Sequence, residues 1–200
     1  MALAYSDPAA VPPHPSLIRS GGLPTGPGVP PTVPGGPRRR IDLLPIAEGF
    51  AVSAPAIREL QGVTERSWVL LAVTDLFEAW AIAWPPGGRI ELHDHGRSRG
   101  AVVVAEGALL ETTVRATKEG VAVIGSRRLS AGEHRTFGPH YVHDLINDDR
   151  HRAVSVHVYG PRLTSMSYYE LDAAGRLDRV RTEAVPPLGP FDATSDHDPS

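Results

Sequence analysis

Two histidines lie one residue apart in the stretch ELHDHGRSRGAVVVAEG, which runs from Glu91 to Gly107. In an extended strand, residues i and i+2 point to the same face, so His93 and His95 would aim both imidazoles into one space while Asp94 points away. Imidazole nitrogens are common metal ligands. The competing interpretation is a solvated turn ahead of a strand, because so short a motif often arises by chance.

Other histidines decide whether this pair holds a metal. A third ligand would have to come from a facing strand, and the segment PHYVHDLIN offers His143, with His140 as its competitor three residues earlier. His134 precedes a strand and is expected to be exposed. The chain contains no cysteine, so it forms no disulfide and no thiolate metal site. Any metal must therefore be held by His, Asp or Glu.

A second polar pattern occurs in the segment SVHVY. Ser155, His157 and Tyr159 alternate with two valines, so the three polar side chains would share one strand face and the valines would pack on the other. The plainer interpretation is an amphipathic strand whose polar face meets solvent. In the more specific one, His157 links Ser155 and Tyr159 by hydrogen bonds and orients the phenol.

The elements that would position these residues are mainly strands. After residue 62 the sequence consists of short runs rich in Val, Ile, Thr and aromatic residues, separated by turn segments such as PPGG at 85–88. This rhythm predicts an all-β fold, an antiparallel sandwich or barrel. Residues 41–62 carry spaced apolar side chains and predict one or two short helices, interrupted at Pro45 and Pro55.

Composition divides the chain into three parts. Residues 1–40 hold ten of the twenty prolines and six of the twenty glycines, which predicts a disordered Pro/Gly-rich arm. Residues 185–200 have the same character and predict a disordered tail. One folded domain is expected over residues 41–184.

Charge and hydropathy exclude several classes of partner. The formal net charge is -3, which gives no general field for attracting nucleic acid or acidic membranes. No apolar run approaches the roughly 20 residues of a membrane span, and no signal peptide is evident. We therefore expect a cytoplasmic protein, a monomer or small homo-oligomer, that acts on small molecules.

The spacing of glycines and histidines resembles the two motifs of the cupin superfamily. The first motif is carried by Gly87, His93, His95 and Gly107. The second is carried by Gly132, the segment Gly138-Pro139-His140, His143 and Asn147. The resemblance covers roughly residues 77–159 and implies a double-stranded β-barrel, or jelly roll, with a metal inside and a short helical region before it.

One departure from the cupin pattern narrows the resemblance. The glutamate ligand that follows the His-x-His pair in most cupins is replaced here, since the corresponding positions are Arg99 and Gly100. A three-histidine site of this kind resembles the bacterial thiol dioxygenases, the cysteine dioxygenase type I family. The resemblance implies Fe(II) held by His93, His95 and His143.

The same resemblance implies an activity. A Ser155-His157-Tyr159 relay would orient the phenol toward bound substrate, and L-cysteine would react with O2 to give cysteine sulfinate. The alternatives are a dioxygenase of another small thiol, such as 3-mercaptopropionate, and a non-catalytic cupin that binds a metal or ligand. A binding module has little need of an ordered phenol beside open coordination positions.

The residue that would recognise the substrate is the least defined part of the resemblance. Members that act on cysteine carry an arginine upstream of the first motif, which pairs with the substrate carboxylate, and Arg66 is the nearest candidate. The tyrosine expected two residues earlier is Thr64. Arg66 as a solvated turn residue and Arg162 as the carboxylate partner are the competing interpretations. Gly100 occupies the position of the cysteine that mammalian-type enzymes cross-link to tyrosine, so no such thioether forms.

Overall fold

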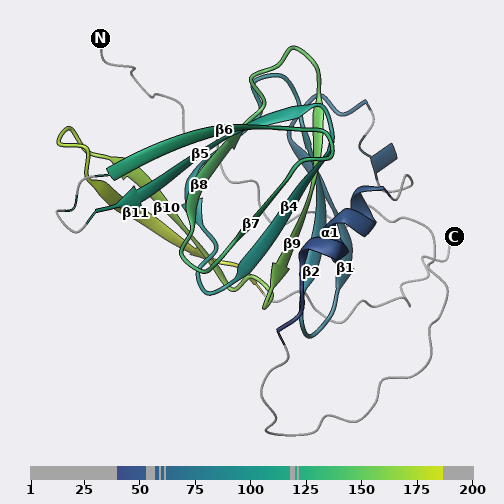
Figure 1. Ribbon diagram of the computed structural model, residues 1–200, viewed down its shortest axis with the longest axis horizontal. Coiled ribbons are helices and arrows are strands. Elements are labelled where there is room, and N and C mark those ends of the chain that lie inside the picture. The colour runs from purple at the N-terminus through teal and green to yellow at the C-terminus, as the bar shows by residue number, and fades with distance from the viewer. Residues whose placement is uncertain are drawn as a thin grey trace, which may run out of the picture. The chain divides into compact units, whose positions relative to one another are not determined.

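Short runs of β-branched and aromatic residues form the strands of two antiparallel sheets in the computed structural model (Figure 1). The structure describes residues 40–52, 57–58, 60, 62–117, 120 and 122–186. Within these residues the strands are β1 (Ser67–Val73), β2 (Glu78–Trp84), β3 (Arg89–Asp94), β4 (Arg99–Glu106), β5 (Ala108–Ala116), β6 (Ala122–Ser130), β7 (His134–Phe137), β8 (Val142–Ile146), β9 (Ala153–Gly160), β10 (Ser165–Leu171) and β11 (Leu177–Ala184).

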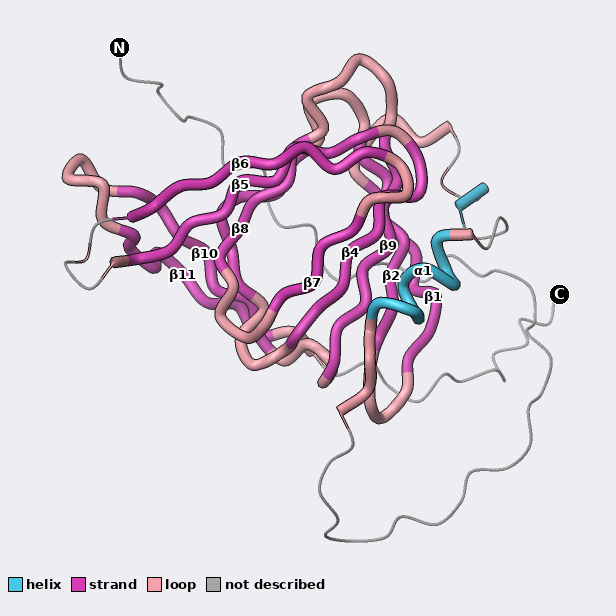
Figure 2. The backbone as a smooth tube through the Cα atoms, viewed as in Figure 1, coloured by secondary structure: helices cyan, strands magenta, loops and turns pink. Residues whose placement is uncertain are grey.

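The two sheets face each other (Figure 2). One sheet has the strand order β1-β2-β9-β4-β7, and the other has the order β11-β10-β3-β8-β5-β6. Apolar side chains from both sheets pack together between them, including Trp84 from the first and Leu109 and Leu145 from the second. The expected all-β fold of antiparallel sheets is confirmed, although the two sheets are not closed into one continuous barrel.

Strand β9 lies inside its sheet between β2 and β4, and all eight of its residues are buried. Val156 and Val158 pack on the outer side of the sheet in a cluster that includes Leu43 and Ala47. Its polar residues therefore face the interior between the sheets. The plainer interpretation of a solvated polar face is wrong, because neither face of this strand meets solvent.

Helix α1 (Leu44–Ala51) covers the outer face of the five-stranded sheet over β4 and β9 (Figure 1). Pro45 lies in its first turn, where the missing N–H removes no helical hydrogen bond. The prediction that Pro45 interrupts a helix is therefore wrong, because this proline begins one. Pro55 lies outside the described residues.

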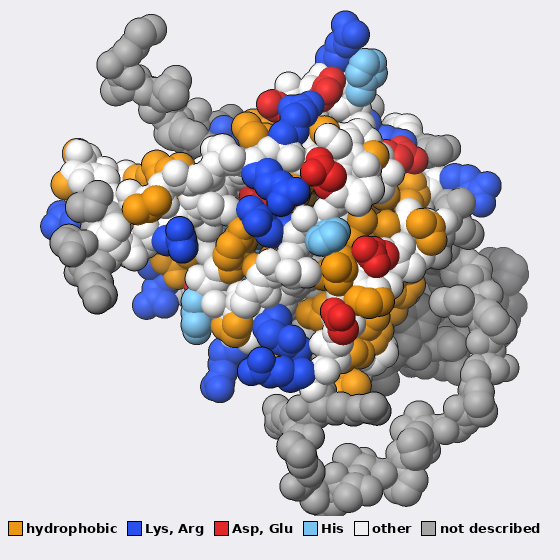
Figure 3. Space-filling model, in the orientation of Figure 1, with side chains coloured by type: hydrophobic (Ala, Val, Ile, Leu, Met, Phe, Trp, Pro, Cys, Tyr) orange, Lys and Arg blue, Asp and Glu red, His pale blue; other side chains and the backbone are white. Residues whose placement is uncertain are grey.

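The predicted terminal segments cannot be compared with the structure, because 1–39 and 187–200 lie outside the described residues. None of the helices in the described part of the chain has the length and apolar character to cross a membrane. On the face shown in Figure 3, basic and acidic side chains lie among apolar ones.

Gly100 on β4 leaves space for an aromatic ring. A Cβ atom at this position would lie 2.1 Å from Phe137 Cζ, and the Phe137 ring is itself packed against His95 and Tyr141. The ring thus fills the space beside a residue without a side chain. Gly138, in the turn after β7, differs from Gly100 in this respect, since a Cβ at Gly138 would meet nothing within 4 Å.

We expect the substitution Gly100→Ala to lower the free energy of unfolding by about 1–3 kcal/mol, because the added methyl group forces the Phe137 ring out of a packed position. Urea denaturation of the metal-free protein measures this. The control is Gly138→Ala, which adds a methyl group to open space and should leave the unfolding midpoint nearly unchanged. Equal midpoints for Gly100→Ala and the wild type would contradict the prediction.

Candidate metal centre

Three imidazoles converge in the interior between the two sheets. His93 on β3 and His143 on β8 are paired directly across neighbouring strands, and His95 follows the end of β3. One ring nitrogen from each lies within 4.8 Å of the other two, and the two Nε2 atoms of His93 and His95 are 3.1 Å apart. All three side chains are buried. The predicted grouping of these histidines is therefore present in the fold.

The competing histidines lie elsewhere. His140 is exposed over 72% of its side chain, and its backbone N–H donates to the carbonyl oxygen of Gly96. His134, at the start of β7, is exposed as expected. Asp94 points away from the imidazoles and accepts hydrogen bonds from the backbone N–H of Gly96 and the hydroxyl of Tyr169. The alternation predicted for the His-x-His pair is observed.

Each imidazole is held in a different way. His93 donates a hydrogen bond from Nδ1 to the carbonyl oxygen of Glu91, with 2.7 Å between the two atoms. His143 Nδ1 lies 2.9 Å from Glu111 Oε1, within hydrogen-bonding distance. His95 instead packs between aromatic rings, with Phe137 stacked at 5.1 Å between ring centroids. The Nε2 atom of His143 is buried and has no hydrogen-bond partner among the described residues. A nitrogen lone pair directed at two further imidazoles suits a metal ion, so the residues fit such a group.

Burial controls the charge state of these ligands. Removal from water lowers the pKa of both His93 and His95 well below the ordinary value, and the neighbouring imidazoles lower it further. Both rings are therefore neutral near pH 7. Neutral imidazole is the form that binds a metal without first releasing a proton.

The polar residues of β9 form a hydrogen-bonded chain beside the centre. Ser155 Oγ lies 2.8 Å from His157 Nε2, and His157 Nδ1 lies 3.1 Å from the Tyr159 hydroxyl. Burial, with smaller contributions from His143 and Arg66, lowers the pKa of His157 to about 3, so this ring is neutral and carries one N–H.

Trp84 sets the direction of this chain. Its indole N–H, which can only donate, lies 2.8 Å from Ser155 Oγ. The Ser155 hydroxyl has no other acceptor among the described residues, so it is satisfied by donating to His157 Nε2. His157 then carries its proton on Nδ1 and donates it to the Tyr159 oxygen. The phenolic proton of Tyr159 remains available for a different acceptor.

Arg66, the residue before β1, reaches the same interior. Its guanidinium carbon lies 4.8 Å from the ring centroid of Trp84 and 5.7 Å from that of Trp68. Burial lowers its pKa, and interaction with the phenols of Tyr159 and Tyr168 offsets this in part. Its Nε atom is buried without a hydrogen-bond partner among the described residues. This position differs from that of a solvated turn residue, although a role in binding substrate stays a prediction.

Two contributors to the centre were not anticipated from the sequence. Glu111 on β5 contacts His143, and Tyr168 on β10 pairs in register with His93, with 6.2 Å between the two ring centroids. The sequence offers one weak signal for the first, an acidic residue within the apolar run ALLETTV. It offers none for the second.

Comparison with known proteins agrees with this geometry. The family model described as cysteine dioxygenase type I matches residues 60–171, more than half of the chain. The chain belongs to the cysteine dioxygenase type I family. The matched region contains the three histidines, Arg66 and the polar residues of β9.

Solved structures of cupin proteins match at lower similarity. A structure of oxalate oxidase is 22% identical, with a TM-score of 0.43 over 50% of this chain and 52% of that chain. The match to KdgF from a Halomonas species has 20% identity and a TM-score of 0.42, over 51% and 84% of the two chains. A sugar phosphate isomerase of the cupin superfamily from Silicibacter pomeroyi is 21% identical with a TM-score of 0.42, over 57% and 76%. The chain spans about half the length of the oxalate oxidase chain.

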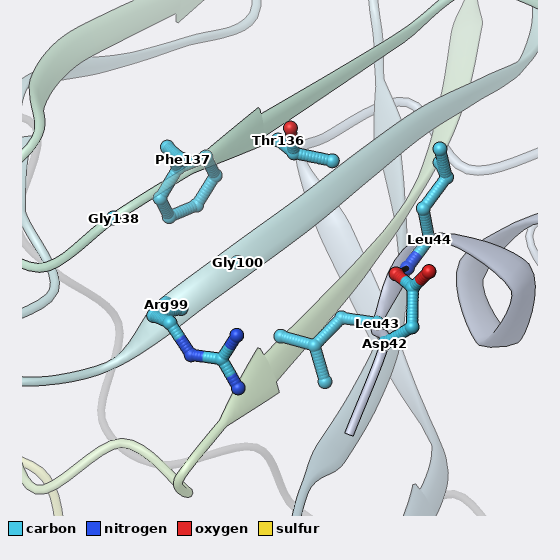
Figure 4. Close-up of a pocket in the computed structure, with 8 residues that line it drawn as sticks. All are labelled: Asp42, Leu43, Leu44, Arg99, Gly100, Thr136, Phe137 and Gly138. Carbon is cyan, nitrogen blue, oxygen red and sulfur yellow. Dashed lines mark hydrogen bonds between the residues drawn. The ribbon is translucent and has the colours of Figure 1, made fainter. Parts of the chain in front are cut away.

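In this member of the cysteine dioxygenase type I family, Phe137 occupies the space beside Gly100. Its ring lies over β4, and its edge also borders an open surface pocket of about 380 Å³ (Figure 4). None of the three histidines lines that pocket. Phe137 thus separates the pocket from the metal ligands, since the same ring stacks on His95.

We expect the metal-free protein to bind one equivalent of a divalent transition metal and to unfold at a higher temperature when the metal is present, because ligands that bind only the folded state stabilise it. The substitution His143→Ala should abolish both effects, whereas His134→Ala, at an exposed position, should change neither. Isothermal titration calorimetry and thermal denaturation with Co(II) or Ni(II) provide the measurement. Unchanged stoichiometry in His143→Ala would remove this residue from the ligand set.

Proposed function

We propose that this protein is an Fe(II)-dependent thiol dioxygenase that converts L-cysteine and O2 to cysteine sulfinate. The observation that carries the proposal is the position of Arg66, a half-buried cation whose guanidinium lies over Trp84 and acts electrostatically on His93 of the three-histidine cluster. Family membership supports a metal-dependent dioxygenase, and the residues of this interior support the choice of thiol.

Arg66 supplies a partner for a carboxylate. No described residue forms an ion pair with it, and its guanidinium lies over the Trp84 ring and interacts electrostatically with the phenols of Tyr159 and Tyr168. A half-buried cation without a counter-charge is unfavourable, so a substrate carboxylate gains both charge pairing and a planar donor that can form two parallel hydrogen bonds. A substrate with a carboxylate and a thiol in one small molecule would satisfy Arg66 and the metal together.

The β9 relay directs a proton into the same space. Because His157 donates to the oxygen of Tyr159, the phenolic O–H can donate to a substrate atom beside the metal centre. Burial raises the pKa of Tyr159, which keeps the phenol protonated at neutral pH. A fixed donor in a dehydrated site stabilises developing negative charge without reorganising during the reaction.

Iron bound by His93, His95 and His143 would favour a thiolate over a thiol and supply the redox chemistry through which O2 reacts. In the overall reaction both oxygen atoms of O2 are transferred to sulfur, and the thiol is oxidised as O2 is reduced. The chain's own contribution is to orient the substrate through Arg66 and to place the Tyr159 proton. The enclosing aromatic rings exclude water from the reacting atoms.

Two alternatives remain as outcomes of the same experiment. A preference for 3-mercaptopropionate would retain the carboxylate contact with Arg66 and dispense with the amino group. A metal-binding cupin without catalytic activity would bind iron and produce no sulfinate.

We expect anaerobically Fe(II)-loaded protein to consume O2 with L-cysteine and to form cysteine sulfinate, identified by mass spectrometry. In Arg66→Met the KM for L-cysteine should rise by roughly 10- to 100-fold, because about 1.5–3 kcal/mol of charged hydrogen bonding is lost. An oxygen electrode measures the rate of O2 consumption by the wild type and by Arg66→Met.

The matched control is Arg162→Met, which removes the other candidate arginine and should leave the KM unchanged. A rise in KM for this variant alone would assign carboxylate binding to Arg162 instead. Faster turnover of 3-mercaptopropionate than of L-cysteine would change the assigned substrate, and no sulfinate from either thiol would reject the proposed activity.

For Tyr159→Phe we expect kcat to fall by about 10- to 100-fold while metal content and KM change little, because a hydrogen-bond donor is lost and no ligand is removed. Steady-state kinetics and metal analysis of the same preparation separate these effects. If kcat were retained, the relay on β9 would have no part in turnover.

A further inference from the structure

Glu111 is a buried carboxylate that contacts a metal ligand. Its side chain and that of His143 are each only 1% exposed, and Oε1 lies 2.9 Å from His143 Nδ1. Arg135 Nε donates to the second oxygen over 2.7 Å, and the Tyr141 hydroxyl donates to Oε1 over 3.2 Å. Three donors therefore converge on one carboxylate, an arrangement that requires it to accept hydrogen bonds.

The sheet places this carboxylate behind the imidazole. Strand β5 pairs with β8, and Thr113 lies directly opposite His143. Glu111 is two residues before Thr113, so it shares the interior face of β5 and reaches His143 diagonally. The contact thus follows from strand register and does not depend on a loop.

We propose that Glu111 is a positioning residue of the metal centre, which fixes the His143 proton on Nδ1 and makes its Nε2 atom a stronger electron donor to the metal. The proposal rests on the metal site described above. A carboxylate that accepts the outer N–H of a ligating histidine fixes its tautomer and raises its basicity.

The other two ligands provide an internal contrast. His93 donates to a neutral backbone carbonyl, and the Nδ1 of His95 has no partner among the described residues. Only His143 is backed by an anion within the described part of the chain. Glu111 therefore contributes negative charge from behind an imidazole, whereas the ligand positions after the His-x-His pair hold Arg99 and Gly100.

Arg135 and Tyr141 limit how much of that charge reaches the imidazole. The Arg135 side chain is 30% exposed, so it connects the buried carboxylate with the surface. Its guanidinium and His143 both contact the Glu111 carboxylate, so the negative charge of Glu111 interacts with both side chains. Removing Arg135 should leave more of that charge on the imidazole, whereas removing the Glu111 charge should weaken the metal site.

The test is a titration of chelator-treated protein with Co(II) in competition with a chromophoric chelator. We expect Glu111→Gln to bind one equivalent with a Kd about 10- to 100-fold weaker than the wild type, because the outer partner of a ligand is lost. The visible absorption bands of bound Co(II) should shift in the same variant, since they report the strength of the ligands.

The matched control is Glu133→Gln, which makes the same chemical change at an exposed carboxylate paired with Arg127. Its Co(II) affinity and spectrum should equal those of the wild type. An unchanged Kd and spectrum in Glu111→Gln would overturn the proposal.

A second variant covers the case in which Glu111→Gln does not fold. Arg135→Gln keeps the carboxylate and should bind Co(II) at least as tightly as the wild type. Weaker binding would overturn the proposal, because a purely structural ion pair loses its effect whichever partner is removed. These readouts do not depend on turnover, so a failure to form sulfinate would reject the proposed activity and leave this inference standing.

Discussion

The polar groups of this protein's metal centre lie in a buried interior, and most of them pair with another protein group there. A buried donor or acceptor left unpaired costs about 1–3 kcal/mol, so the arrangement of partners decides how the site is built. His93 uses a backbone carbonyl, His143 uses the Glu111 carboxylate, and the Ser155 hydroxyl stands between an indole and an imidazole. These contacts leave defined atoms pointing inward, which is what a metal and a substrate require.

The two-residue period of the strands makes such a site compatible with a stable fold. On β9 the valines complete an apolar cluster beneath α1, while the alternate residues carry the relay. One face of this strand therefore packs in the apolar core, and the other face carries the hydrogen-bonded polar residues beside the metal centre. Because β9 lies between β2 and β4, its backbone pairs with a strand on each side, and this pairing holds the relay residues in place.

Strand periodicity also explains which features could be predicted from the sequence. The convergence of His93 with His95 and the shared face of Ser155, His157 and Tyr159 follow from the alternation of side chains within a strand. The fold class followed from the rhythm of short strands and turns. Each of these predictions needed only local information.

Contacts between strands distant in sequence could not be predicted in this way. Glu111 reaches His143 because β5 pairs with β8, and Phe137 fills the space at Gly100 because β7 pairs with β4. The start of α1 was misjudged for a different reason, since Pro45 breaks a helix interior but suits a first turn. Register and position within an element decided these cases, and residue types alone do not determine either.

The charges around the centre restrict the kind of molecule that suits it. A divalent metal at the three histidines and the Arg66 guanidinium would be two cationic groups in one poorly hydrated space, and their mutual repulsion is weakened little by water there. A thiol without a carboxylate could neutralise only the first. A molecule that presents a thiolate to the metal and a carboxylate to Arg66 would neutralise both cations. Its carboxylate would accept hydrogen bonds from the planar guanidinium, which already lies over the Trp84 ring. If the proposed activity holds, selectivity would depend mainly on Arg66, because a bound thiol lacking the carboxylate would leave this half-buried cation unpaired.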